Sequence, residues 1–126
     1  MKIIIDAMGG DHAPEQIVAG ALQAAKEFGI ELILVGRGEE LLSCMKAQGW
    51  DTLPAGVEVA NAEDVVDMHT EPADVLRLHR GASMVMGLKM LADGGGDAFI
   101  SAGSSGALLT AATLLVKRIR GIRRAA

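Results

Sequence analysis

Two glycine-rich segments, each lying between an apolar run and a helix-like run, limit the folds open to this chain. The first covers residues 6–14 and reads D-A-M-G-G-D-H-A-P, and the second covers residues 101–107 and reads S-A-G-S-S-G-A. Glycine permits a sharp turn and a close approach of the backbone to a ligand. The unpaired N–H groups and the dipole of a following helix favour an anion there. We therefore expect both segments to be loops of a phosphate-binding site.

The apolar periodicity predicts an alternating order of strands and helices. Strands are expected at residues 2–5, 30–35, 57–60 and 97–101, and helices at 14–28, 39–48, 71–79, 83–92 and 108–116. Pro14 is expected in the first turn of its helix, and Gly29 is expected to end that helix in a left-handed conformation. Residues 62–68 fit either a helical turn or a loop. This order predicts right-handed crossovers and one α/β domain over residues 1–126, with α/β/α layers around a mainly parallel sheet.

The composition excludes several classes of protein. A net charge of −4 and only three aromatic residues disfavour single-stranded nucleic-acid binding, which uses aromatic side chains in a basic groove. Cys44 is the only cysteine, so an internal disulfide or a cysteine-based zinc site is excluded, and we expect a reducing, cytoplasmic location. Histidines and acids occur at no metal-ligand spacing, so no metal site is expected. No run approaches the ~20 apolar residues of a membrane-spanning helix.

Basic residues gather near the end of the sequence, within residues 117–124. They are Lys117, Arg118, Arg120, Arg123 and Arg124. This pattern fits the C-terminus of a helix, whose dipole favours cations, and it also fits a docking patch for an acidic partner.

In a parallel sheet, ligands bind beyond the carboxyl ends of the strands. If the strands before the two loops are neighbours, the loops converge on one crevice that is rich in neutral donors. Neither G-x-G-x-x-G nor the lysine-containing P-loop pattern is present. The candidate phosphate- and substrate-binding residues in the loops are Asp6, Gly9, Gly10, Asp11, Ser101, Gly103 and Gly106, with further hydroxyls from Ser104 and Ser105.

Other polar residues have two interpretations each. His12 is either a general base or a residue that lines the start of the helix. Asp6 ends a buried strand, so we expect its carboxylate to accept backbone N–H groups and to brace its loop. Arg80 and Lys89 either reach a phosphate or lie on the surface. Ser105 precedes a helix as nucleophilic serines do, but G-x-S-x-G is absent and no histidine–acid pair is assignable, which disfavours a covalent mechanism.

The first loop, the Ser83-Met84 step, and the Asp97–Phe99 run leading into the second loop together resemble the PlsX phosphate acyltransferases of bacterial phospholipid synthesis. The resemblance extends over the whole chain and implies the N-terminal portion of such an enzyme, with a fold like that of the isocitrate and isopropylmalate dehydrogenases. The family's second loop usually reads S-A-G-N-T-G-A, and here Ser104 and Ser105 replace Asn and Thr.

The resemblance implies acyl transfer from acyl-[acyl-carrier protein] to inorganic phosphate, giving acyl-phosphate and free carrier protein without a cofactor. Phosphate is then the nucleophile, and His12, Ser104 and Ser105 are the candidate catalytic residues. The resemblance further implies a homodimer and allows peripheral association with a membrane. The alternative is a non-catalytic α/β module that binds phosphate or a nucleotide.

Overall fold

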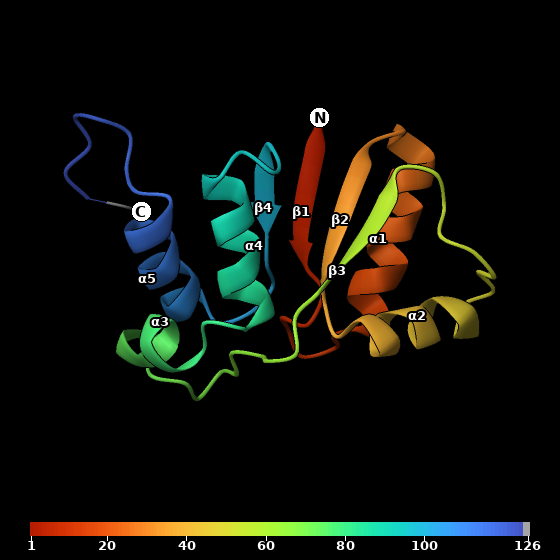
Figure 1. The fold of residues 1–126 in the computed structure, drawn as a ribbon, viewed down its shortest axis with the longest axis horizontal. Helices are drawn as coiled ribbons and strands as arrows, with labels where there is room; N and C mark the ends of the chain where they lie inside the picture. Colours follow the sequence, from red (N-terminus) through yellow and green to blue (C-terminus); the bar gives the residue numbers. More distant parts are fainter. Residues whose placement is uncertain (125–126) are drawn as a thin grey trace.

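The computed structural model describes residues 1–124 (Figure 1). Its strands are β1 (Lys2–Asp6), β2 (Glu31–Gly36), β3 (Val57–Asn61) and β4 (Ala98–Ile100). Its helices are α1 (Glu15–Phe28), α2 (Gly38–Ala47), α3 (Val75–Leu78), α4 (Ser83–Ala92) and α5 (Ser105–Leu115), and a 3-10 turn, η1, covers Pro72–Asp74. The predicted alternation of strands and helices is confirmed.

The strands form one sheet in the order β3-β2-β1-β4. Each of the three strand pairs is parallel, and Ile4 of β1 lies between Ile33 of β2 and Phe99 of β4. The chain therefore proceeds outward from β1 to β3 and then crosses back to place β4 on the other side of β1. The predicted parallel sheet is confirmed, and the strands before the two glycine-rich loops are neighbours.

Helices cover both faces of this sheet (Figure 1). Successive strand residues point to opposite faces. Leu32 and Leu34 pack in a core with α1 and α2, whereas Ile33 and Val35 pack on the other face with Met86 and its neighbours on α4. This arrangement confirms the three-layer α/β/α architecture. The more specific likeness to isocitrate and isopropylmalate dehydrogenases stays a prediction.

A third core joins α4 to α3 and α5. It includes Val75, Met84, Leu88 and Ala107, all almost fully buried. Gly87 lets α4 lie directly on β4, because a Cβ at this position would overlap the ring of Phe99. Within residues 1–124, no helix combines the length and the apolar character that crossing a membrane requires.

Most expected boundaries agree with the structure to within a few residues. Gly29 ends α1 with φ 63°, as predicted. The placement of Pro14 was wrong: it is the residue before α1, where its restricted φ also fits and its missing N–H is not needed. Residues 62–68 form a loop, and the helix expected at 71–79 is divided into η1 and α3.

A candidate anion site where two loops meet

The two glycine-rich loops lie together at the switch point of the sheet. The crossover through α1 covers one face, and the crossover that brings the chain back through α4 covers the other. Loops that follow neighbouring strands on the two sides of such a point define the usual ligand crevice of open α/β sheets. The expected convergence of the loops is therefore confirmed.

Asp6 is the residue that holds the loops together. It is only 2% exposed. Its Oδ1 accepts from the backbone N–H of Met8 at 3.1 Å and from the hydroxyl of Ser83 at 2.5 Å. Its Oδ2 accepts from the hydroxyl of Ser101 at 2.8 Å. A buried carboxylate needs such donors, and the expected bracing role is confirmed, now extended to the second loop and to α4. These contacts involve both carboxylate oxygens.

The loops touch through glycines. A Cβ on Gly9 would lie 2.6 Å from Asp6 Oδ2 and 2.9 Å from Ser101 Oγ, and a Cβ on Gly103 would lie 3.6 Å from Gly9 Cα. Gly10 has φ +114° and faces Ala102, whose Cβ would lie 3.2 Å from an added Cβ. The loops thus pack directly against each other. The backbone of the two loops on either side of this contact forms a shared rim.

That rim carries backbone donors. Within residues 1–124, no protein group accepts a hydrogen bond from the N–H of Gly9, Gly10 or Asp11 in the first loop. The same holds for Ser105 and Gly106, which are the first two residues of α5. Free N–H groups at the start of an eleven-residue helix attract an anion.

The three serines of the second loop have different surroundings. Ser101 donates to Asp6 and accepts from the N–H of Gly103 at 3.1 Å, so its oxygen already has partners. Ser104 is the N-cap of α5 and accepts from the N–H of Ala107 at 3.3 Å, which leaves its own proton to donate. Ser105 is exposed. Of these hydroxyls, those of Ser104 and Ser105 are the ones available to a ligand.

The charged candidates lie on different segments of the chain. Asp11 and His12 are exposed on the first loop. Arg80 lies in the turn before α4, where its Nε donates to the carbonyl of Leu76. Lys89 is exposed in the second half of α4, about 9 Å along the helix axis from Ser83, toward the edge of the sheet where β4 begins. The structure therefore does not bring Lys89 to the loops.

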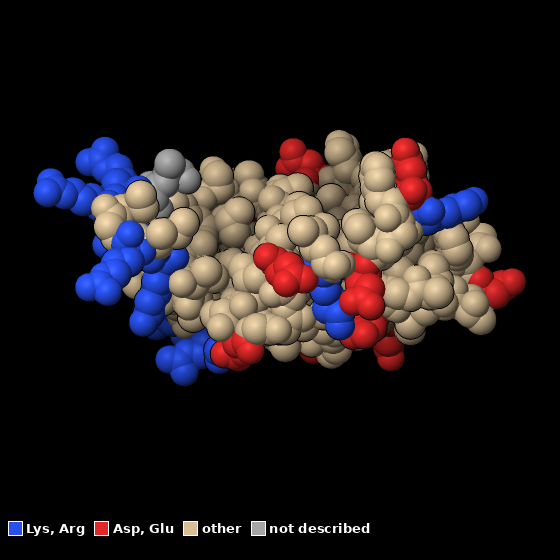
Figure 2. All heavy atoms as spheres, turned by 90° about the horizontal axis from the view of Figure 1, so that it is seen from above, with Lys and Arg blue, Asp and Glu red and all other residues tan. Residues whose placement is uncertain are grey.

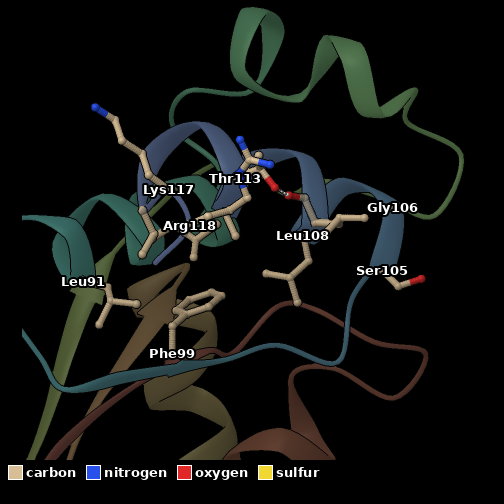
Figure 3. Close-up of a pocket in the computed structure, with 12 residues that line it drawn as sticks. Leu91, Phe99, Ser105, Gly106, Leu108, Thr113, Lys117 and Arg118 are labelled. Carbon is tan, nitrogen blue, oxygen red and sulfur yellow. Dashed lines mark hydrogen bonds between the residues drawn. The ribbon is translucent and has the colours of Figure 1, made fainter. Parts of the chain in front are cut away.

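A hollow of about 650 Å³ borders the second loop on its α5 side. Figure 3 shows Ser105 and Gly106 at one end of it and Lys117 and Arg118 at the other. Its walls are apolar side chains from α4, β4 and α5, among them Leu91, Phe99 and Leu108. The hollow thus joins an apolar surface to the free donors at the start of α5.

The basic segment lies beyond α5. The helix ends at Leu115 and has no basic residue in its last turn. Because a helix dipole acts mainly within the last turn, complementing it does not account for the five cations. Figure 2 shows blue Lys and Arg side chains gathered at the end of the molecule where α5 lies, with one acidic side chain beside them and the others over the rest of this face. The interpretation as a docking patch stays a prediction.

Sequence reasoning missed two polar contacts near the site. Ser83 is almost fully buried against Asp6, and its place before Met84 in the resemblance was the available signal. His79 is half-buried, and its Nδ1 lies 2.7 Å from Oδ2 of Asp64. Within the described residues, no three His, Cys, Asp or Glu side chains are grouped as a metal site would require.

Known proteins resemble this chain over its whole length. Residues 1–126 match a family model described as "Fatty acid synthesis protein". The chain belongs to this family. Relatives named phosphate acyltransferase include one from Dictyoglomus thermophilum, 42% identical over all of this chain and 37% of the relative. One from Herpetosiphon aurantiacus is 43% identical over 98% of this chain and 33% of the relative. One from Desulfitobacterium hafniense is 44% identical over 100% of this chain and 37% of the relative. The chain thus spans about a third of the length of these family members.

Proposed function

We propose that this chain supplies the phosphate-holding loops of a phosphate acyltransferase, which transfers an acyl group from acyl-[acyl-carrier protein] to inorganic phosphate. The observation that carries the proposal is the rim of free backbone N–H groups where two glycine loops meet on Asp6. The names of its relatives agree with it. Acyl-phosphate made in this way serves phospholipid synthesis.

The reaction requires two things of the rim. It must hold phosphate with one oxygen about 3 to 3.5 Å from the thioester carbon, and it must donate hydrogen bonds to the oxyanion that develops there. A C–O bond forms, the C–S bond breaks, and the thiolate leaves with the carrier protein. The N–H groups of Ser105 and Gly106 and the hydroxyl of Ser104 are the proposed donors, and His12 is the proposed source of the proton for the thiolate.

The proposal extends to partners and location. A homodimer is supported by exposed apolar side chains on and after α5, including Leu114 at 59% and Ile119 at 81% exposure. We place the acyl-carrier protein at the loop rim and the enzyme in the cytoplasm. The free thiol of Cys44 supports that compartment.

A chimera tests the function. Residues 1–126 would replace the matching third of the Dictyoglomus thermophilum relative, and the release of free carrier protein from acyl-[acyl-carrier protein] would be measured with and without phosphate. Turnover that depends on phosphate is expected. Phosphate binding without turnover, while the unmodified relative is active in the same assay, would instead favour a non-catalytic phosphate-binding module.

A further inference from the structure

We propose that Ser83 is a positioning residue that sets the geometry of both glycine loops through Asp6. The inference rests on the proposed function, because the loops are taken to hold phosphate. Ser83 itself is 1% exposed, and the structure gives it no place on the rim. Its effect on a ligand must therefore pass through Asp6.

The contact that carries the inference is the 2.5 Å hydrogen bond from Ser83 Oγ to Asp6 Oδ1. The same oxygen accepts from the N–H of Met8 at the start of the first loop. The other oxygen accepts from Ser101, whose Oγ in turn accepts from the N–H of Gly103 in the second loop. The carboxylate plane is therefore fixed by Ser83 on one side and by Ser101 on the other. Without the Ser83 hydroxyl, Oδ1 keeps only the N–H of Met8 as a donor, and the carboxylate loses one of the three contacts that orient it toward the two loops.

Ser83 is itself held by a second set of contacts. It is the first residue of α4, and its N–H donates to the carbonyl of Asp64 at 3.1 Å. The side chain of Asp64 contacts His79, which directly follows α3. Ser83 thus links the segment between β3 and α4 to the two loops. A buried hydroxyl with these contacts suits a linking role better than one of simply filling space.

Amide hydrogen exchange of this chain, followed by NMR, tests the role without requiring activity. In Ser83→Ala, we expect exchange of the Met8 and Gly103 amides to accelerate about tenfold or more. The amides whose hydrogen bonds pair β2 with β3 should keep their exchange rates. Ser43→Ala, at an exposed serine of α2, is the control and should change none of these rates. Equal acceleration throughout the sheet, or no acceleration at Met8 and Gly103, would overturn the proposal.

A second variant covers the case in which Ser83→Ala does not fold. Ser83→Cys keeps the shape of the side chain and weakens its donor, so exchange at Met8 and Gly103 should be faster than in the wild type. Wild-type exchange at both amides in this variant would also contradict the proposal.

The chimera adds a functional measurement. There, Ser83→Ala should raise the KM for phosphate about tenfold, while Ser43→Ala leaves it unchanged. A chimera without phosphate-dependent turnover would refute the proposed function but leave the exchange result standing. Faster exchange at the two amides with a wild-type KM would instead refute the positioning role alone.

Discussion

The hydroxyl of Ser101 donates to Oδ2 of Asp6 over 2.8 Å, although 95 positions separate the two residues in the sequence. Asp6 ends β1, and Ser101 follows β4. The bond exists because β4 pairs with β1 in parallel register, with Ile5 opposite Ile100. It joins the carboxyl ends of neighbouring strands and fixes the starting point of both loops.

We expect Asp6→Ala to destabilise the fold by about 3 kcal/mol. The change leaves the hydroxyls of Ser83 and Ser101 and the N–H of Met8 without their acceptor, and each unsatisfied buried donor costs about 1 to 3 kcal/mol unless it finds water. Asp6→Asn keeps one acceptor oxygen and should cost about 1 kcal/mol. Urea unfolding measures both variants, and equal stability of Asp6→Ala and the wild type would contradict the bracing role.

Close packing of the loops predicts that Gly9→Ala is harmful. The added Cβ would meet Asp6 Oδ2 at 2.6 Å and Ser101 Oγ at 2.9 Å, so the hydrogen bond between these groups must shift. We expect a loss of about 1 to 3 kcal/mol in unfolding free energy and weaker phosphate binding by calorimetry. Gly20→Ala is the control, since nothing lies within 4 Å of its Cβ and it is in the interior of α1, where alanine should stabilise by about 0.5 to 1 kcal/mol. A neutral Gly9→Ala would show that the loops have room to move apart.

Gly10→Val should abolish phosphate binding while most of the secondary structure remains. Gly10 has φ +114°, which a β-branched residue disfavours, and its Cβ would lie 3.3 Å from the carbonyl oxygen of Ala102. Gly49→Val provides a matched comparison, because Gly49 has φ +94° but no atoms within 4 Å of a Cβ and follows α2. Both variants should lose stability by circular dichroism melting, and the loss of phosphate binding should be confined to Gly10→Val. Unchanged affinity in a folded Gly10→Val variant would remove the first loop from the site.

The strands and helices with a regular apolar pattern could be predicted from the sequence. The apolar run from Leu32 to Val35 is buried on both faces of the sheet, and this continuous pattern identified its strand. The two glycine loops could also be predicted, because each is one continuous segment whose residues identify it without any distant contact. The bond from Ser83 to Asp6 was not predicted, because a serine at the start of a helix has no periodic signal and its partner is set by how α4 packs on the sheet. Residues 62–68 follow no periodicity, and their course is fixed by contacts such as that of Asp64 with Gly81.

Cys44 gives a prediction about pH dependence. Partial burial, together with the charges of Glu15 and Glu40, raises the pKa of its thiol. Since the thiolate is the reactive form, the midpoint of the iodoacetamide alkylation rate against pH should lie higher in the folded chain than in the chain unfolded in urea. Replacing Glu15 and Glu40 by Gln should lower that midpoint part of the way. A folded midpoint at or below the unfolded one would contradict this account.

Ser104 separates a capping role from a catalytic one. Its Oγ accepts from the N–H of Ala107 and caps α5, so Ser104→Ala should cost about 1 kcal/mol, whereas Ser104→Asn, which also caps well, should leave the melting temperature unchanged. In the chimera, the Asn side chain adds an amide donor at the start of the helix. If that donor contacts the oxyanion only in the transition state, kcat rises with little change in the KM for phosphate. A hydrogen bond worth about 1 to 3 kcal/mol corresponds to a rate increase of about fivefold to two-hundredfold. Equal kcat for serine and asparagine, with equal melting temperatures, would assign Ser104 to the cap alone and leave the N–H groups of Ser105 and Gly106 as the donors of the second loop.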